Sequence, residues 1–171
     1  MTPIITDLDL IAQQAAVSQD DYEAFRYYVE ADDRSDEELD GLVEKIACPI
    51  INAIDCTECA NCCRSLDVYL TPEDAERLAA GINVTFSELS EGYIDHPRAE
   101  VEAEWGVFRH CPCVFLEGKR CQIYKHRPES CRAYPEFTPD FRWQLEHILG
   151  GAGICPIIYN VIEALKQELN W

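Results

Sequence analysis

Four cysteines crowd into eight residues of this chain, and that run constrains the fold more than any other sequence feature. Cys56, Cys59 and Cys62 follow one another at intervals of three, and Cys63 comes directly after. A two-residue spacer lets both thiolates of a pair turn onto one ion, so it recurs in zinc knuckles and iron–sulfur loops. The run therefore predicts a metal site that holds either an iron–sulfur cluster or zinc.

The remaining ligands of such a site must come from far along the chain. The bacterial ferredoxin run opens with the same three cysteines, but its fourth member, a Cys-Pro after three residues, is absent here. Each later cysteine alone would be weak evidence, because an unpaired cysteine is most often a small buried hydrophobe. Together the two groups supply enough thiolates for two four-coordinate sites. The later group consists of Cys111, Cys113, Cys121, Cys131 and Cys155.

Three further residues bear on the choice of ligands. Cys48 lies on the apolar stretch of an expected helix, so we expect it to be a core residue rather than a ligand. His110 and His126 flank cysteines and could each replace one of them as a ligand, although the cysteines already suffice.

Composition and the N-terminal sequence indicate the compartment. With 171 residues, 47% of them hydrophobic, the chain can bury a core without metal or disulfides. The N-terminus turns acidic at once and has no basic region, so a secretory signal is not expected. No apolar run approaches the roughly 18 residues of a membrane span. We therefore expect a cytoplasmic protein with reduced thiols that are available to metal.

Charge is unevenly spread along the chain. The net charge is −18, so an anionic nucleic acid or membrane is not an expected partner. Residues 1–47 hold 13 acidic and 3 basic residues, whereas residues 109–142 hold seven basic and four acidic ones. Because nearby cations favour deprotonated thiols, the second stretch predicts charge compensation around a thiolate cluster. We expect Arg127 and Arg132 to supply it.

Helical periodicity dominates the first third of the chain. We expect two or three amphipathic helices before residue 55, with starts at 18–21 and at Ser35, where Glu38 completes a capping box. Pro49 would kink or end the second of these helices near Cys48.

The middle of the chain predicts two further helices and a hairpin. Thr71 with Pro72 begins a helix that Gly81 would close. A shorter helix starts at Thr85 or Ser87 and ends near residue 95. Residues 104–124 alternate in short apolar stretches, which predicts a small β-hairpin with cysteines on and beside its strands.

The C-terminal part predicts a flexible joint at residues 150–153, followed by a helix that opens at Cys155. The apolar face of that helix is expected to be a core stripe formed by Ile157, Ile158, Val161, Ile162, Leu165 and Leu169. The expected fold is mainly α with a small β-hairpin, a single metal-organised α+β domain with cysteine-rich loops. Within it, residues 1–47 form an acidic helical segment packed on a cysteine-cluster metal-binding domain at 48–171.

The sequence resembles the YkgJ-like cysteine-cluster proteins, also called the zinc- or iron-chelating domain family. The residues that carry the resemblance lie at 55–63, 70–79, 113–116, 121–135 and 155–160, and the likeness covers roughly residues 40–168. Cys48 and Cys111 fall outside the family pattern. The resemblance implies eight metal ligands, namely Cys56, Cys59, Cys62, Cys63, Cys113, Cys121, Cys131 and Cys155.

The resemblance indicates the cofactor better than the reaction. Members are described both as zinc- or iron-chelating proteins and as iron–sulfur oxidoreductases. A flagellin-lysine methylase carries a similar cysteine segment in a larger chain, but no methyl-donor site is recognisable in this sequence. We expect an iron–sulfur cluster, of the 4Fe–4S type, with an electron-transfer or redox-sensing role and an unnamed redox or protein partner. Whether the chain is an iron–sulfur oxidoreductase stays open. The alternative is a structural zinc protein with four-cysteine sites that serves as a binding module without catalysis.

Overall fold

The computed structural model describes residues 3–171, which form two compact units. Unit 1 combines the chain up to Asp55 with Pro135–Trp171, and unit 2 is the continuous segment Cys56–Tyr134. The sequence interpretation instead drew one boundary, between residues 47 and 48. The structure assigns the last 37 residues to the same unit as the N-terminal helices.

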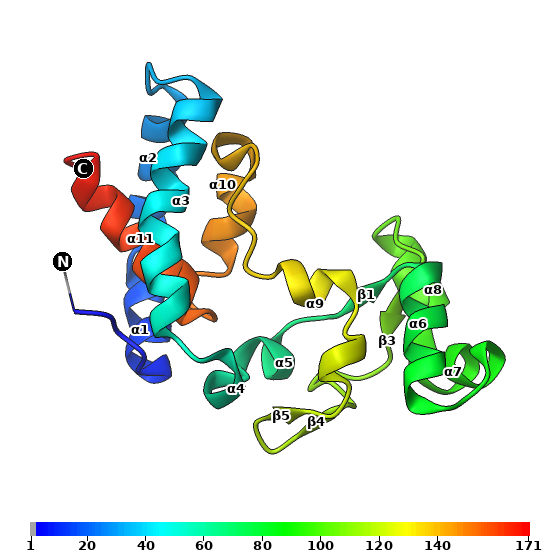
Figure 1. The fold of residues 1–171 in the computed structure, drawn as a ribbon. Helices are drawn as coiled ribbons and strands as arrows, with labels where there is room; N and C mark the ends of the chain where they lie inside the picture. The colour runs from blue at the N-terminus through cyan, green and yellow to red at the C-terminus, as the bar shows by residue number, and fades with distance from the viewer. Residues whose placement is uncertain (1–2) are drawn as a thin grey trace. The chain divides into compact units, whose positions relative to one another are not determined.

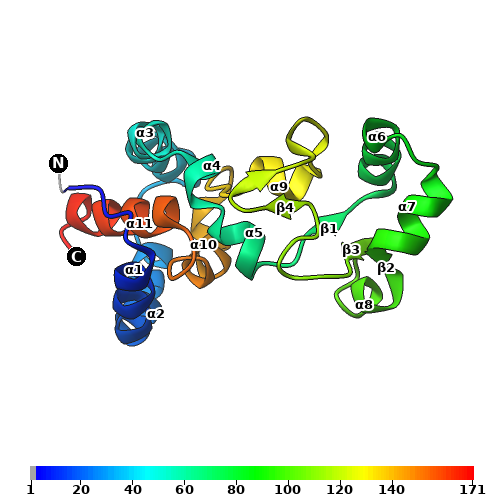
Figure 2. The ribbon, with the colours of Figure 1, turned by 90° about the horizontal axis from the view of Figure 1, so that it is seen from below.

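Unit 1 is built from helices alone among the residues that the structure describes. Its helix α11 contacts α3 on one side and α1 on the other (Figure 2), while α10 contacts α2 and α3. The apolar face expected for the last helix is buried, with each of its six side chains at most 4% exposed. The helices are α1 (Leu8–Val17), α2 (Gln19–Glu30), α3 (Asp36–Ala53), α10 (Phe141–Gly150) and α11 (Pro156–Glu168).

Helix α3 confirms its predicted start and excludes an end at Pro49, one of the two effects expected of that proline. The Ser35 side chain accepts from the N–H of Glu38, and Glu38 accepts in return from the N–H of Ser35. Pro49, however, lies inside the helix, which continues to Ala53. Burial of one face, at positions 39, 43, 47 and 50, outweighs the hydrogen bond that proline removes. Cys48 lies off that face and is exposed, so the expectation of a core cysteine was wrong.

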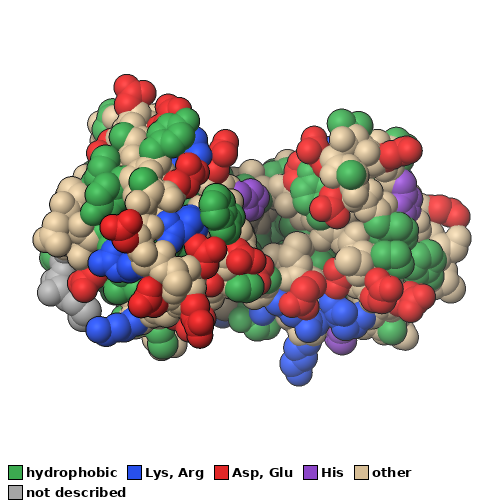
Figure 3. All heavy atoms as spheres, turned by 90° about the horizontal axis from the view of Figure 1, so that it is seen from above, with side chains coloured by type: hydrophobic (Ala, Val, Ile, Leu, Met, Phe, Trp, Pro, Cys, Tyr) green, Lys and Arg blue, Asp and Glu red, His purple; other side chains and the backbone are tan. Residues whose placement is uncertain are grey.

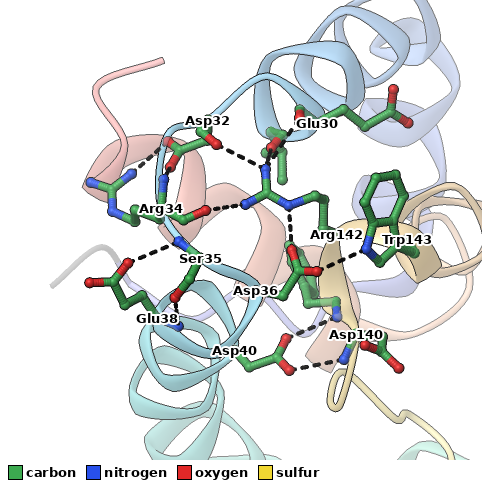
Figure 4. Close-up of polar contacts among 12 residues, drawn as sticks. Glu30, Asp32, Arg34, Ser35, Asp36, Glu38, Asp40, Asp140, Arg142 and Trp143 are labelled. Carbon is green, nitrogen blue, oxygen red and sulfur yellow. Dashed lines mark hydrogen bonds and ion pairs between the residues drawn. The ribbon is translucent and has the colours of Figure 1, made fainter.

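A buried arginine connects the end of α2 to the start of α3 (Figure 4). Arg142, only 5% exposed, donates to the carbonyl oxygens of Val29 (2.5 Å), Asp32 (3.1 Å) and Arg34 (2.5 Å). Its Nε also pairs with the carboxylate of Asp36 at 2.6 Å. Carbonyl groups at a helix C-terminus lack hydrogen-bond donors within the helix, and the guanidinium of Arg142 provides donors to them.

The expected flexible joint at residues 150–153 is a packed turn. The N–H of Ala152 donates to the carbonyl of Leu149 (3.0 Å), and the N–H of Cys155 donates to that of Gly151 (2.9 Å). Ala152 is fully buried, and a side chain at Gly153 would contact Ala15 of α1. The segment is therefore held by its own backbone hydrogen bonds and by burial of Ala152.

Unit 2 is assembled from short helices and strands (Figure 1). Its antiparallel sheet has the order β1-β3-β2, with Tyr69 opposite Val107 and Ile94 opposite Phe108. Strands β4 and β5 form a separate hairpin whose turn contains Gly118 at a φ of 61°. The elements are α4 (Cys56–Cys59), α5 (Asn61–Ser65), β1 (Tyr69–Leu70), α6 (Pro72–Ile82), α7 (Phe86–Tyr93), β2 (Ile94–Asp95), α8 (His96–Val101), β3 (Gly106–Phe108), β4 (Leu116–Glu117), β5 (Arg120–Cys121), a 3₁₀ turn (Tyr124–His126) and α9 (Glu129–Ala133).

These elements confirm the mainly α fold class with a small β component. The hairpin expected within 104–124 exists as β4 and β5, whereas β3, from the start of that stretch, pairs with β1 and β2 instead. Of the two expected starts of α7, Thr85 is the N-cap, and Glu88 completes a capping box with it. Helix α6 begins at Pro72 as expected but passes through Gly81 and ends at Ile82, and its C-cap Asn83 adopts the left-handed conformation.

The two units differ in net charge. Unit 1 contains 19 acidic and 5 basic residues, and unit 2 contains 13 acidic and 9 basic residues. On the face drawn in Figure 3, Asp and Glu side chains are scattered rather than gathered into one patch. Among residues 3–171, no helix has the length and apolar character that crossing a membrane requires.

Candidate metal centre

The first cysteine run folds into two short helices that are broken at one residue. Ala60, at a φ of 52°, ends α4 after Cys59 and redirects the chain into α5, which carries Cys62 and Cys63. A guanidinium N–H of Arg64 donates to the carbonyl of Cys59 at 2.6 Å across this break. Helix α4 also contacts strand β5, so the run lies beside the hairpin of the second cysteine group.

Backbone hydrogen bonds join the two cysteine groups. The N–H of Cys113 donates to the carbonyl of Cys63 at 2.8 Å, and the N–H of Leu116 donates to the carbonyl of Cys113 at 3.0 Å. Leu116 is in turn the register partner of Cys121 in the hairpin. Three cysteines that are far apart in sequence are thereby held together at the open end of the β4–β5 hairpin.

A fourth thiol, Cys131 in α9, completes a group of mutual neighbours. Burial raises the pKa of Cys131 to about 12, and the thiolates of Cys113, Cys63 and Cys121 raise that pKa as well. Burial also raises the pKa of Cys113 and of Cys121. The side chains of Cys113, Cys121 and Cys131 pack against the hydrophobic core of unit 2 and are half-buried. We call Cys63, Cys113, Cys121 and Cys131 the four-thiol group.

One member of the four-thiol group ionises more easily than the others. The pKa of Cys63 is lowered to about 6, chiefly by a hydrogen bond with Cys62, whose sulfur lies 4.0 Å away, and further by the charges of Arg127 and Arg64. A first thiolate therefore forms near neutral pH, and its charge opposes ionisation of the other three. Full deprotonation of the group requires added positive charge, which a metal cation supplies.

Two backbone N–H groups also face sulfur atoms in this group. The N–H of Phe115 bonds to the sulfur of Cys113, and the N–H of Ile123 bonds to the sulfur of Cys121, and each bond lowers the pKa of its thiol. In each case the N–H belongs to the second residue after the cysteine, and the bond favours the thiolate form that binds metal.

The donor set fits a soft metal. Across residues 3–171, no three His, Cys, Asp or Glu side chains lie as close together as a bound ion would hold them. The four-thiol group nevertheless consists of thiols alone, and thiolates select zinc and iron–sulfur clusters over hard cations. It is half-buried, it lies beside two arginines, and backbone N–H groups face its sulfurs. These residues can hold either kind of group.

The other candidate ligands are distributed over both units. Cys155 is buried at the start of α11 in unit 1, whereas the other seven predicted ligands belong to unit 2. Cys111 is exposed, with its thiol directed at the carbonyls of Arg64 (3.4 Å) and Leu66 (3.7 Å). His110 is exposed as well.

The two arginines predicted to balance thiolate charge have different surroundings. Arg127 lowers the pKa of Cys63 and opposes the rise at Cys121 and Cys131, so its charge reaches the four-thiol group. Arg132 donates to the backbone carbonyls of Arg127 (3.0 Å) and Lys125 (3.4 Å). Arg132 thus supports the loop between β5 and α9.

Sequence reasoning missed one residue near this loop. Asp74 was not expected to have a functional role, yet it is 3% exposed and its side chain accepts from the N–H of Glu129 at 3.1 Å. The only sequence signal was its position in the capping box with Thr71. That position explains the bond to its own helix and not the bond to α9.

A half-buried group of thiols on a hairpin and short helices defines a metal-chelating protein. The chain belongs to the CxxCxxCC family, described as "Putative zinc- or iron-chelating domain", whose model matches residues 55–155. The match covers all of unit 2 and continues into unit 1 as far as Cys155. No solved structure matches the chain.

Proposed function

We propose that unit 2 holds an iron–sulfur cluster through cysteine thiolates and serves as a redox or electron-transfer module. The observation that carries the proposal is the four-thiol group, which gathers cysteines from three separate segments beside the Cys-x2-Cys-x2-Cys run. Four thiolates are the complement of one 4Fe–4S cluster. Cys56, Cys59 and Cys62 in unit 2 and Cys155 in unit 1 remain from the eight family positions as further candidate metal ligands.

The surroundings of the four-thiol group suit a charged cluster. An iron–sulfur cluster, when bound, supplies one-electron transfer, and its reduction potential depends on net charge, hydrogen bonds to sulfur and solvent exposure. Arg64 and Arg127 provide positive charge, and the N–H groups of Phe115 and Ile123 bond to sulfur. The half-buried position leaves an edge through which electrons can pass to a partner. Because the chain carries a net charge of −18, that partner is a protein rather than a nucleic acid.

A structural zinc module is the second candidate. The observation that favours it is that the four-thiol group is also a complete ligand set for one tetrahedral zinc ion. Zinc there would join α5, the hairpin and α9 and would carry no electrons.

Metal and sulfide analysis of protein purified without oxygen separates the two functions. The proposal expects iron and acid-labile sulfide in comparable amounts, a broad visible absorption, and bleaching by dithionite. Stoichiometric zinc without sulfide would overturn the iron–sulfur proposal and establish the zinc module.

Cysteine variants test which thiols matter. Replacing Cys121 or Cys131 by serine should remove most of the bound metal, since a serine hydroxyl is a poor ligand for soft metals. Cys48→Ser is the matched control, because Cys48 is exposed on α3 and belongs to unit 1. If Cys48→Ser empties the site while Cys121→Ser leaves it full, the assignment of the four-thiol group is wrong.

A further inference from the structure

One face of α6 runs along the loop that joins Cys121 to Cys131. Three residues of this face, at successive helical turns, each meet a residue of the loop, and the two segments run in opposite directions. Asp74 meets Glu129, Arg77 meets Arg127, and Gly81 meets His126. These three contacts hold the part of the chain between the last two cysteines of the four-thiol group.

Asp74 contributes the most buried of these contacts. Its side chain is 3% exposed and forms an ion pair with Arg77. Oδ1 accepts from the N–H of Glu129 at 3.1 Å, and Oδ2 accepts from the N–H of Thr71 at 3.2 Å. Glu129 is the first residue of α9, so its N–H has no partner within that helix. Asp74 therefore caps a second helix, the one in which Cys131 follows two residues later.

Arg77 and Gly81 extend the contact toward Cys121. Arg77 donates to the carbonyl of Arg127 at 3.2 Å, while its other partner is the carboxylate of Asp74. At Gly81 a Cβ atom would lie 2.3 Å from the ring of His126, so only glycine allows this approach. These two contacts fix the backbone around Arg127. They thereby also fix the guanidinium of Arg127, whose charge reaches the four-thiol group.

We propose that Asp74 is a positioning residue for the metal centre. It acts through Arg77 and the N–H of Glu129 to set the separation of Cys121 and Cys131 and the placement of Arg127. The inference rests on the proposed metal-binding function and adds to it a residue that touches no metal. Groups that orient metal ligands typically change metal affinity about 10–100-fold when they are removed.

The test uses the full chain loaded with Co²⁺ as a spectroscopic probe. The near-ultraviolet thiolate-to-cobalt band reports how many thiolates bind, and a competing chelator gives the rate of metal loss. Asp74→Ala should release cobalt about 10–100-fold faster than the wild type and weaken this band. Asp74→Asn, which keeps an oxygen for the N–H of Glu129, should lie between the two.

Two control variants separate positioning from helix capping. Glu88 holds the equivalent position in the capping box of α7, and Glu88→Ala removes the same kind of cap. Thr71→Ala removes the side-chain cap of α6 but keeps Asp74. Both should release cobalt at the wild-type rate. If either releases it as fast as Asp74→Ala, the effect is helix stability, and the positioning role is excluded.

The remaining outcomes keep the two proposals apart. A wild-type chain that takes up neither cobalt nor iron contradicts the metal site, yet hydrogen exchange at residues 124–131 still tests the contact. Faster exchange there in Asp74→Ala than in Glu88→Ala supports it, and equal exchange overturns it. Should Asp74→Ala not fold, Gly81→Ala replaces it and should also accelerate cobalt loss. Wild-type release by Asp74→Asn and Gly81→Ala together would refute the inference.

Discussion

The two units of this molecule reach stability by different means. Of the buried apolar side chains among the described residues, 24 lie in unit 1 and 12 in unit 2. The longest helix of unit 1 has 18 residues, whereas that of unit 2 has 11. In unit 2 the small core borders directly on Cys113, Cys121 and Cys131. The difference indicates that hydrophobic burial stabilises unit 1 more than unit 2. Under the proposed function, metal–thiolate bonds would add to the smaller core of unit 2.

Removing the metal should give the largest effect and should affect one unit only. Structural metal sites contribute on the order of 10–16 kcal/mol in small domains, comparable to the about 5–15 kcal/mol that stabilises a whole domain. A chelator should therefore abolish most hydrogen-exchange protection within Cys56–Tyr134 and leave α3 and α11 protected. Equal protection with and without metal across unit 2 would show that the metal does not hold this unit together.

Disrupting unit 1 should have the reverse selectivity. Arg142→Ala leaves buried carbonyls at the end of α2 without donors, and breaking a buried charged contact typically costs about 3–5 kcal/mol. Because Asp36 is partly exposed, we expect about 3 kcal/mol, measured as the free energy of unfolding of unit 1 in urea, with unchanged metal content. Arg34→Ala is the control, because its exposed ion pair contributes about 1 kcal/mol or less. Loss of metal in Arg142→Ala would show that the units are not energetically separate.

The contribution of Asp36 to the acid sensitivity of unit 1 should be the smallest of these effects. Hydrogen bonds from Arg142 and Trp143 lower the pKa of Asp36 from its ordinary value of 3.8. A lowered pKa means that the stabilisation is present above pH 3.8 and is lost as the pH falls through the pKa of the folded protein. The thermal stability of unit 1 should therefore decrease as the pH falls through this range. The Asp36→Asn variant should be less stable than the wild type at neutral pH, and its stability should depend less on acid. An unchanged acid response in Asp36→Asn would contradict this origin.

Local signals in the sequence predicted most of unit 1. The capping box at Ser35 and the apolar periodicity of the last helix are set by residues three or four apart, so they can be found without the fold. The path of α3 through Pro49 depends instead on which face the rest of unit 1 buries. The same dependence explains why Cys48 is exposed, because its neighbours on the helix form the buried stripe.

Unit 2 was less predictable because its order comes from contacts between distant residues. Strands of two or three residues carry too little periodicity to show that β3 pairs with β1 and β2. Cysteine spacing identified the candidate ligands, but spacing alone could not separate the four-thiol group from Cys111. The contact between Asp74 and Glu129 spans 55 positions, and only the fold brings the two together.

The chain order of the two units has a consequence for synthesis. Unit 2 is one continuous segment, whereas unit 1 needs α10 and α11, which are made last. At about 5–20 residues per second, the final 37 residues take roughly 2–7 s to be added after Tyr134. During that interval all the cysteines of unit 2 have been made, while α1 to α3 still lack the helices that cover their apolar faces. Unit 2 therefore has the earlier opportunity to fold, because none of its elements waits for a later segment of the chain.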